Sequence, residues 1–338
     1  MDILLLEPLV PEAMKWLQAR YAVSLEPELA SDTRGLRNAL YKVRSLVVPR
    51  EVMVSRELLD FAPKLQAVAR LQLGTDNTDL EACKERQVRV IHPSSANVRS
   101  NAEYLLACLL MLYRRGMVSS LLGRSAGTPR LGRELYGSVL GILGLAPTAH
   151  ALAPMLTALG VRLVGYDPAI HHTAPIWERL GIEAVSLPAL ASQSDAVSVQ
   201  MLYASRYRGF IGENMLAHCK PAQIWVGISR SALFEPQALA GALQDGRIEA
   251  CMFDGAEAGF ASAGTPLHGL KNLFLTPRLG SLTHEARLRA SWYVAHRLHQ
   301  ALEIPTSGLD RIAAGPMDLE LPAGEVASQW AEPDFSQQ

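Results

Sequence analysis

Residues 140–160 read LGILGLAPTAHALAPMLTALG, and this stretch decides the fold. The apolar run before Gly144 predicts a buried strand, Gly144 predicts a tight turn, and the alanine- and leucine-rich run from Pro147 predicts a helix. A strand, a glycine turn and a helix in this order are typical of the first unit of a Rossmann dinucleotide-binding domain. The stretch therefore predicts a parallel α/β sheet with a ligand site at the turn.

The glycine pattern of that turn is incomplete. The dinucleotide fingerprint uses three glycines, one for the turn, one where the backbone meets the pyrophosphate and one for helix–strand packing. Only Gly144 is present, and Ala146 and Ala149 occupy the other two positions. Pro147 suits a first helical turn but removes one N–H that would hold phosphate, and Pro154 is expected to kink the helix. The pattern favours the fold and leaves dinucleotide binding open.

A carboxylate follows the next predicted strand, 161–166. Asp167 comes 23 residues after Gly144, near the spacing of the residue that binds the adenosine ribose hydroxyls. A carboxylate at this place favours NAD over NADP because it repels a 2′-phosphate. The alternative is that Asp167 only starts a turn before Pro168.

Short apolar runs alternate with helical patterns along most of the chain, which predicts two doubly wound parallel-sheet α/β domains, one Rossmann and one flavodoxin-like. We expect residues 1–99 with 283–304 to form a substrate-type domain, 100–282 the Rossmann domain and 305–338 an extended tail. Ligands are expected in the cleft between the domains. The predicted strands are 3–6, 45–48, 65–69, 88–91, 139–143, 161–166, 196–200, 223–228, 250–253 and 273–275, and the predicted helices include 11–20, 76–85 and 283–302.

A long helix separates the two series of strands. Ser100 and Glu103 have the spacing of a capping box, and Gly116 is suited to end the helix. The glycine-, serine- and proline-rich residues 123–132 that follow predict a loop.

The composition excludes several classes of protein. The chain has 338 residues, of which 49% are hydrophobic, and a net charge of −1, so nothing in its charge favours nucleic acid or acidic membranes. Its longest strongly apolar stretch, 105–113, is far shorter than the roughly 20 residues that span a bilayer. The four cysteines are widely spaced, as expected of reduced thiols, and no His, Cys and Asp residues have metal-ligand spacing. We therefore expect a cytoplasmic protein with no metal and no membrane partner.

From about residue 65 to 303 the chain resembles the NAD-dependent D-2-hydroxyacid dehydrogenases, the family of phosphoglycerate dehydrogenase, formate dehydrogenase and the C-terminal binding protein corepressors. The resemblance is carried in order by LGTDNTDLEA at 73–82, NAEY at 101–104, ELYGSVLG at 134–141, the region 216–239 and NLFLTPRLG at 272–280. Matches in the same order along the chain are specific for fold and ancestry and less specific for activity.

The resemblance implies a catalytic arginine, histidine and glutamate, and this chain retains one of them. Arg230 matches the arginine that binds the substrate carboxylate and carbonyl. The histidine position, after Pro277, holds Arg278, and the glutamate position, 29 residues after the arginine, holds Gly259. A guanidinium does not exchange a proton near pH 7, and a general acid–base group typically contributes about 10²–10⁴-fold in rate. Normal hydride transfer between 2-hydroxyacids and 2-oxoacids is therefore not expected.

The resemblance also places substrate- and cofactor-binding residues. Small residues usually precede Gly74, where backbone N–H groups hold the substrate carboxylate, but here Arg70 is followed by Leu71, Gln72 and Leu73, and Gln72 puts an amide into that space. We take Arg70, Gln72, Leu73, Gly74 and Arg230 as the substrate-binding candidates.

Asp254 matches a carboxylate that faces the nicotinamide carboxamide, although an aspartate at a strand end can also simply face water. The strand near the nicotinamide usually ends His-x-Pro, and here it ends at Gln200, Met201 and Leu202.

Two arginines at one cleft would suit a small anionic metabolite, such as a dicarboxylate or a phosphorylated acid. The alternative for Arg278 is a local salt bridge to Glu257 or Glu285. His284 is either a displaced base or a solvated helix residue, and His150 either contacts phosphate or lies on the surface.

Three functions remain open from the sequence. The first is a diverged family member that binds NAD weakly, or an anionic metabolite, and performs altered chemistry. The second is a working oxidoreductase with a rebuilt acid–base group, and the third is a non-catalytic regulatory protein. Family members pair through their Rossmann domains, and the apolar face formed by Leu105, Cys108, Leu109 and Tyr113 leads us to expect a homodimer.

Overall fold

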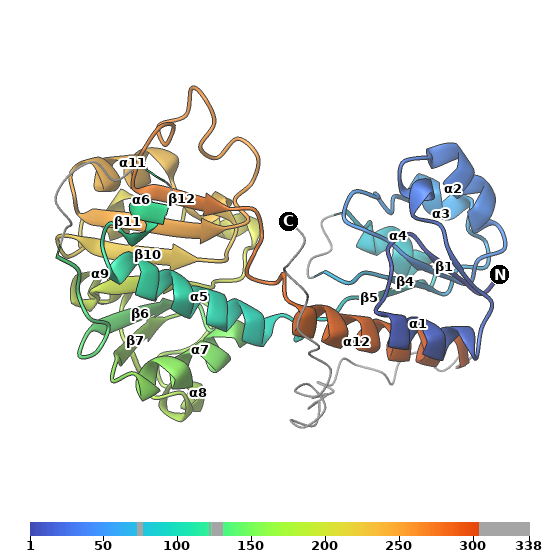
Figure 1. Cartoon of the computed structure of the whole chain (residues 1–338), viewed down its shortest axis with the longest axis horizontal. Helices are drawn as coiled ribbons and strands as arrows, with labels where there is room; N and C mark the ends of the chain where they lie inside the picture. Colours follow the sequence, from blue (N-terminus) through green and yellow to red (C-terminus); the bar gives the residue numbers. More distant parts are fainter. Residues whose placement is uncertain (73–76, 122, 124–130, 304–338) are drawn as a thin grey trace, which may run out of the picture. The chain divides into compact units, whose positions relative to one another are not determined.

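A computed structural model describes residues 1–72, 77–121, 123 and 131–303 (Figure 1). Contacts divide the chain into two compact units, one formed by Met1–Ser95 with the described residues from Arg287 onward and the other by Ala96–Ala286. The expected boundaries lay at 99/100 and 282/283. The expected tail, 305–338, lies outside the described residues.

The second unit contains a sheet of seven parallel strands in the order β12-β11-β10-β9-β6-β7-β8. The chain adds β7 and β8 on one side of β6 and then returns to add β9 to β12 on the other side, so the direction of winding reverses between β6 and β9. This is the doubly wound Rossmann arrangement that the sequence predicted. The strands are β6 (Val139–Leu143), β7 (Arg162–Tyr166), β8 (Ile182–Ala184), β9 (Ala196–Val199), β10 (Gln223–Gly227), β11 (Ile248–Asp254) and β12 (Leu273–Thr276).

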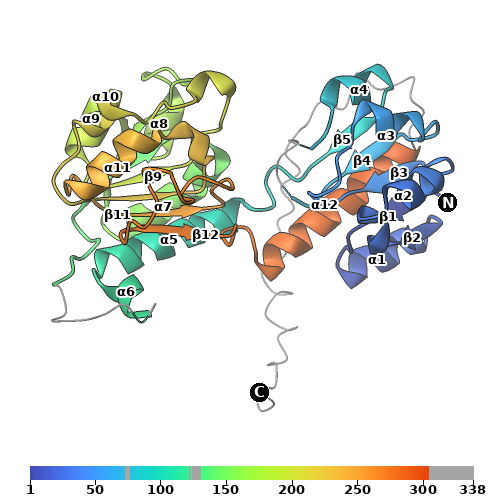
Figure 2. The same ribbon diagram turned by 90° about the horizontal axis from the view of Figure 1, so that it is seen from above.

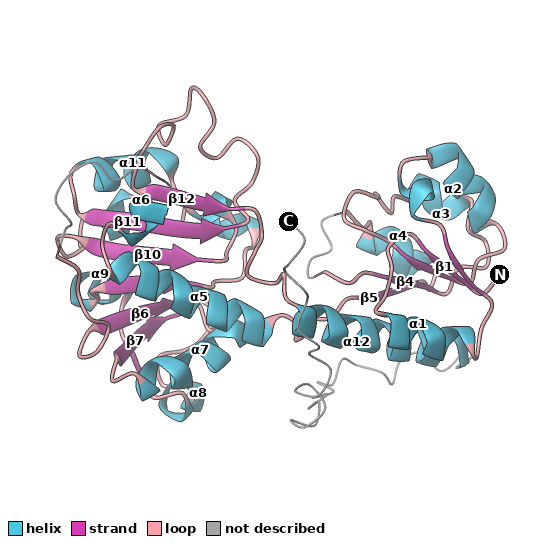
Figure 3. Cartoon of the chain, viewed as in Figure 1, coloured by secondary structure: helices cyan, strands magenta, loops and turns pink. Residues whose placement is uncertain are grey.

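Helices cover both faces of this sheet (Figure 3). One face packs against α5 (Val98–Tyr113), α7 (Pro147–Ala158) and α8 (Pro175–Arg179). The other packs against α9 (Leu187–Gln193), α10 (Glu213–Leu216) and α11 (Pro236–Gln244). Three further short helices are α6 (Met117–Leu121), η2 (Ser205–Tyr207) and η3 (Ser231–Leu233). Because both faces of the sheet are buried, the sequences of its strands are continuous apolar runs.

The helix that follows Gly144 forms as expected. It begins at Pro147, with Ala146 as its N-cap, and continues through Pro154 to Ala158. Its buried residues recur every three or four positions, which is the period of an amphipathic helix on a sheet. They are Thr148, Ala149, Leu152, Ala153 and Leu156.

The predicted capping box on the long helix was wrong. Helix α5 begins at Val98, so Ser100 lies inside its first turn. The Ser100 hydroxyl lies 2.7 Å from Thr283 Oγ1, and Glu103 instead forms an ion pair with Arg99 at 2.6 Å. Both side chains therefore have partners other than the helix N-terminus.

The residues proposed for a dimer interface belong to the core of their own unit. Leu105 and Leu109 are fully buried there, and Cys108 and Tyr113 are each 2% exposed. The assumption that this face is more than one domain can bury was therefore wrong, because the sheet and α7 already cover it.

The first unit has five parallel strands in the order β2-β1-β3-β4-β5, the flavodoxin-like order that the sequence predicted. The strands are β1 (Ile3–Leu5), β2 (Val23–Leu25), β3 (Ser45–Val47), β4 (Ala67–Ala69) and β5 (Arg89–Ile91). One face packs against α2 (Thr33–Leu40), α3 (Arg56–Asp60) and α4 (Leu80–Glu85). A short helix, η1 (Pro27–Ala30), follows β2.

The last helix of the chain, α12 (His284–Glu303), completes this first unit by lying beside α1 (Pro11–Gln18), as Figures 1 and 2 both show. The Val10 N–H donates to Ser291 Oγ at 3.1 Å, and Arg44 Nη2 donates to the Leu302 carbonyl at 3.0 Å. The Trp16 ring packs edge-on against Trp292. Residues from the two ends of the described chain thus share one core.

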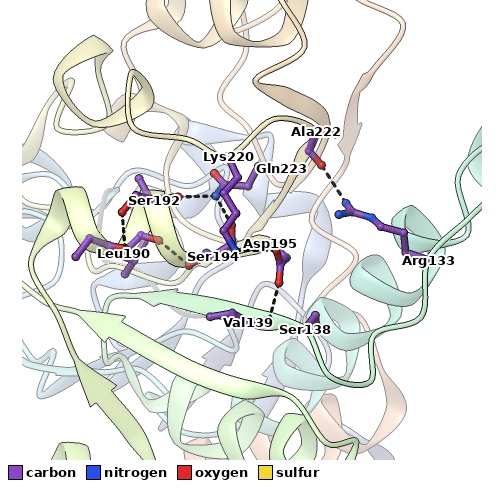
Figure 4. Close-up of polar contacts among 12 residues, drawn as sticks. Arg133, Ser138, Val139, Leu190, Ser192, Ser194, Asp195, Lys220, Ala222 and Gln223 are labelled. Carbon is purple, nitrogen blue, oxygen red and sulfur yellow. Dashed lines mark hydrogen bonds and ion pairs between the residues drawn. The ribbon is translucent and has the colours of Figure 1, made fainter.

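Polar contacts tie together the amino-terminal ends of the Rossmann strands (Figure 4). Asp195 accepts a hydrogen bond from the Val139 N–H at 2.8 Å and pairs with Lys220 at 2.9 Å. The buried Gln223 amide donates to the carbonyls of Ala191 and Ser194. These contacts lie at the amino-terminal ends of the strands, whereas ligands of open α/β sheets bind at the carboxyl ends. We therefore interpret the contacts as structural.

Among the described residues, no helix is long and apolar enough to cross a membrane, and no cluster of three His, Cys, Asp or Glu side chains is placed to hold a metal ion. All four cysteines are free thiols, as the sequence predicted, and all are buried.

Candidate functional site

The carboxyl end of β6 leads directly into Gly144, which has a φ of +95°. A Cβ at this position would lie 2.4 Å from Met201 Cα and 2.5 Å from Met201 N, so only glycine fits. The backbones that follow β6 and β9 therefore meet where the winding direction reverses. In open α/β sheets this crevice is the ligand-binding position.

The N-terminus of α7 borders the same crevice. No side chain forms a capping hydrogen bond at this helix start, and Pro147 has no N–H to contribute. Ala149 is fully buried, and its N–H donates to the Ala146 carbonyl at 2.7 Å. His150 is exposed, which agrees with the surface alternative. Binding of a phosphate at this helix start stays a prediction.

Asp167 holds the turn after β7 in place. One carboxylate oxygen accepts from the Leu145 N–H at 2.7 Å, and the other accepts from the Ala169 N–H at 2.8 Å. The second bond is the local turn that the alternative interpretation expected. The first bond fixes the half-exposed carboxylate beside the Gly144 turn.

Arg230 follows β10 and lies near an acidic partner. Its Nε is 3.6 Å from Glu257 Oε1, and its guanidinium lies 5.4 Å from the centre of the Tyr203 ring. Glu257 also accepts hydrogen bonds from the N–H and the hydroxyl of Ser231. A salt bridge from Arg278 to Glu257 or Glu285 was one alternative from the sequence, and Glu257 pairs with Arg230, because the turn into η3 brings Arg230 and Ser231 to the loop after β11.

Arg278 follows β12 and is exposed, with a φ of +59° that is unusual for a residue other than glycine. Its side chain lies against Gly255, where an added Cβ would be 2.6 Å from Arg278 Cγ. Gly259 is exposed and has a φ of +91°. His284, at the start of α12, is exposed as well.

Asp254 is buried and does not face water, so that alternative was wrong. One of its oxygens accepts from Thr276 Oγ1 and from the Leu279 N–H, and the other accepts from the Gly280 N–H. Tyr104 extends the network by bonding Thr276 Oγ1 at 2.6 Å. Asp254 therefore shapes the backbone turn that contains Arg278, and its proposed role toward a carboxamide stays a prediction.

In the first unit, charged residues gather where β1, β4 and β5 end. Arg70 is 3% exposed, and Glu7 accepts a hydrogen bond from the Leu71 N–H. Burial raises the pKa of Glu7 despite that bond and the nearby Arg287 and Arg70. Burial, together with Arg70, lowers the pKa of His92, so this imidazole is neutral at pH 7.

The sequence analysis did not single out Glu7 and His92. Glu7 lies two residues after the end of β1, and His92 directly follows β5. The carboxyl ends of strands are where ligand-binding side chains gather in α/β proteins, so this position was an available signal. Among the predicted substrate residues, Gln72 is exposed. Leu73 and Gly74 lie outside the described residues.

The family model for the NAD-binding domain of D-isomer specific 2-hydroxyacid dehydrogenases matches residues 107–280. The chain is 31% identical to the (S)-sulfolactate dehydrogenase of Chromohalobacter salexigens, over 90% of this chain and 99% of that protein. It is 33% identical to the D-3-phosphoglycerate dehydrogenase of Mycobacterium leprae over 80% of this chain, and the match spans only 51% of that protein's length.

Solved structures show the same fold. A protein from Thermus thermophilus superimposes with a TM-score of 0.75 at 26% identity, covering 90% of this chain and 97% of that one. The D-lactate dehydrogenase of Aquifex aeolicus, solved with NAD and lactic acid, gives a TM-score of 0.71 at 20% identity, covering 89% and 95%.

A Rossmann unit with a reversal of winding at Gly144 and a flavodoxin-like unit define a two-domain α/β protein with doubly wound parallel sheets. Together with the relatives above, they show that this chain belongs to the NAD-dependent D-2-hydroxyacid dehydrogenase family.

Proposed function

We propose that this protein binds NAD weakly, together with a small anionic metabolite, and that it transfers hydride to ordinary 2-oxoacids far more slowly than other family members do. The observation that carries the proposal is Arg278, which stands at the family's acid–base position and cannot exchange a proton near neutral pH. Gly259 adds to it, because a residue without a side chain cannot supply the carboxylate that orients and tunes a histidine.

The residues around Gly144 fit a dinucleotide. The close approach of Gly144 to Met201 leaves no room for a side chain, and Asp167 lies beside the turn. NAD would supply the hydride chemistry, while Asp167 and the α7 N-terminus would hold it. Pro147 removes one donor, and a lost hydrogen bond to a charged group weakens affinity by roughly 10- to 150-fold. Binding is therefore expected to be weak, with NAD preferred over NADP.

An anionic ligand is supported by the two arginines that follow β10 and β12. Arg230 lies after β10, with its Nε 3.6 Å from Glu257 Oε1. Arg278 carries a second positive charge at the same edge of the sheet. A ligand carboxylate is the group that such guanidiniums bind best.

The binding test is titration of the purified protein with NADH and NADPH by calorimetry. We expect weak binding of NADH and weaker binding of NADPH. Asp167→Ala should weaken the binding of NADH and reduce the preference for NADH over NADPH. Asp245→Ala, a control at an exposed residue after α11, should change neither affinity. Tighter NADPH binding by the wild type, or no dinucleotide binding at millimolar concentration, would contradict the proposal.

The activity test uses glyoxylate, pyruvate, hydroxypyruvate and 3-phosphohydroxypyruvate with NADH. Turnover is expected at least about 10²-fold below the usual 1–10³ per second. Ordinary turnover on any of these substrates would refute the role given to Arg278.

A working dehydrogenase with a rebuilt acid–base group is the second candidate, and it is favoured by the names of the relatives, which are ordinary dehydrogenases. Sulfolactate carries a carboxylate and a sulfonate, and two arginines suit such a dianion. His92 is the side chain to substitute first, because its Nδ1 is buried without a partner among the described residues. This candidate requires ordinary turnover of sulfolactate with NAD and its loss in His92→Asn.

A further inference from the structure

The carboxylate of Glu257, three residues after β11, is held in place by Ser231. Its Oε2 accepts a hydrogen bond from the Ser231 N–H at 2.8 Å and another from the Ser231 hydroxyl. The Glu257 N–H donates in return to Ser231 Oγ at 3.3 Å, and Ser231 is 6% exposed. Three hydrogen bonds to a buried residue therefore fix one side of this carboxylate.

The loop that carries Glu257 is anchored in the core of the Rossmann unit. The Phe260 N–H donates to the Glu257 carbonyl at 3.1 Å, and the turn between them passes through Gly259 at a φ of +91°. The Phe260 ring is 9% exposed and lies 6.4 Å from the Phe234 ring, directly after η3. The position of Glu257 is therefore set by packing on both sides of the turn.

The second oxygen of Glu257 faces a cation but does not form a hydrogen bond with it. Oε1 lies 3.6 Å from Arg230 Nε, beyond the roughly 2.7–2.9 Å of a charge-assisted hydrogen bond. Other arginine–carboxylate pairs, such as Arg162–Glu183, close to 3.1 Å. The Glu257 side chain is 35% exposed, and Oε1 is accessible to solvent. Oε1 is therefore an acceptor that a ligand can reach.

Glu257 and Arg230 lie where ligands of this fold bind, after the carboxyl ends of the neighbouring strands β10 and β11. A guanidinium only donates hydrogen bonds and an ionised carboxylate only accepts them. Side by side, they match a ligand that carries a carboxylate next to a donor. An ammonium group suits Oε1 better than a hydroxyl does, because its charge adds to the hydrogen bond, and a carbonyl oxygen would repel Oε1.

We infer that Glu257 is a ligand-binding residue, and that its Oε1 accepts a hydrogen bond from an ammonium group beside the carboxylate that Arg230 binds. The ligand class is then an acidic α-amino acid. Its single negative net charge matches the net charge of +1 that Arg230, Glu257 and Arg278 carry together. The inference rests on the proposed binding of a small anionic metabolite and does not require a bound dinucleotide.

The experiment compares aspartate, malate and succinate, which share one four-carbon dicarboxylate skeleton and differ in having an ammonium, a hydroxyl or neither. Each acid, with both enantiomers of the first two, is titrated into the full-length protein without dinucleotide and followed by ligand-observed NMR. Glu257→Gln keeps an amide oxygen for Ser231 but removes the charge. Glu235→Gln is the matched control, because Glu235 is an exposed carboxylate that follows η3. Thermal melting of every variant is measured alongside.

We expect the wild type to bind one enantiomer of aspartate about 3- to 10-fold more tightly than succinate, the effect of a partly exposed charged hydrogen bond, with malate between them. Glu257→Gln should weaken aspartate by a similar factor. It should leave succinate unchanged or bind it more tightly, because a negative charge has been removed. Glu235→Gln should change neither affinity. Opposite responses to two acids of one skeleton are not expected of a residue that only stabilises η3.

Equal binding of all three acids by the wild type, tighter binding of malate than of aspartate, or an equal loss of aspartate and succinate in Glu257→Gln would overturn the inference. If Glu257→Gln does not fold, Ser231→Ala replaces it, since it removes the hydroxyl that holds the carboxylate, and an unchanged preference for aspartate in that variant overturns the inference as well. Binding of succinate without a preference for aspartate leaves the proposed function standing. Wild-type protein that binds none of the three acids at millimolar concentration refutes the proposed anionic ligand, and the inference with it.

Discussion

At the scale of single residues, the sharpest structural constraint is at Gly144. An alanine there would meet the Met201 backbone, which has no flexible end that can move aside, and would also have to adopt a φ of +95°. Gly246 is a matched control, since its φ is +82° but nothing lies within 4 Å of an added Cβ. Gly246→Ala should lose about 1–2 kcal/mol of unfolding free energy, and Gly144→Ala at least about 1 kcal/mol more. Urea denaturation measures both, and equal losses would show that the contact relaxes.

Arg278 allows a second prediction at this scale. Arg278→His alone should leave turnover of 2-oxoacids within about tenfold of the wild type, because Gly259 still provides no carboxylate to orient the new imidazole. The backbone at residue 278 also has a φ of +59°, so the imidazole starts from an uncommon conformation. NADH absorbance follows the reaction. A gain of about 10²-fold from this single substitution would mean that the rest of the site is intact.

At the scale of the elements, the polar contacts of Asp195 at the starts of β6, β9 and β10 predict that the free energy of unfolding falls in acid. Burial alone would raise the pKa of Asp195, but the hydrogen bond from the Val139 N–H and the Lys220 ammonium outweigh burial and lower it. A lowered pKa gives stability that is present above the unfolded value of about 3.9 and is lost as pH falls through the folded value. The wild type should therefore lose this contribution below about pH 4.

Asp195→Asn isolates that contribution. The variant should lose about 1.5–3 kcal/mol of unfolding free energy at pH 7, and its stability should fall less steeply in acid. Glu183→Gln, which removes an exposed ion pair with Arg162, should change stability by less than about 1 kcal/mol. Denaturation at pH 7 and at pH 3 to 4 tests the difference, and parallel acid profiles for wild type and Asp195→Asn would contradict it.

The sequence predicted the elements around Gly144 well but missed two of the four edge strands, β2 and β8, while it found β5 and β12. The strand, turn and helix at 140–160 combine an apolar run, a required glycine and a helical period, and all three signals agree. Strands β2 and β8 were missed because they are short edge strands whose burial is mixed, so they carry no continuous apolar run. The capping-box pattern failed because Thr283, far along the chain, bonds Ser100 instead.

In the candidate site, too, the sequence predicted some features and missed others. The sequence positions of Arg230, Arg278 and Gly259 followed from a family pattern. The pairing of Arg230 with Glu257 depends on how η3 and the loop after β11 approach each other, and nothing local to either residue encodes that approach. The amide atoms of the buried Gln200 side chain have no hydrogen-bond partner among the described residues, and this too becomes visible only in the three-dimensional structure.

At the scale of the whole molecule, we propose that the protein is a homodimer through its Rossmann unit, as expected from the family. The inner face of α5 is buried in its own core, so the proposal shifts to the exposed Leu110, Met117 and Leu121 of α5 and α6. Leu110→Glu should favour the monomer, while Leu25→Glu, at a residue of equal exposure in the other unit, should not. Light scattering at micromolar concentration tests this, and a monomeric wild type would rule the dimer out.

The path of the chain through the first unit has a consequence for synthesis on the ribosome. Residues 1–95 form the sheet, but the α12 contacts that complete its core, from Ser291 to Leu302, are translated only after the whole Rossmann unit. At about 5–20 residues per second, roughly 10–40 s separate the two parts. During that time the Rossmann unit can fold, while the nascent first sheet has one apolar face incompletely covered. A nascent chain whose α12 has not yet emerged would thus expose an apolar face of the first sheet, which is the kind of surface that chaperones bind.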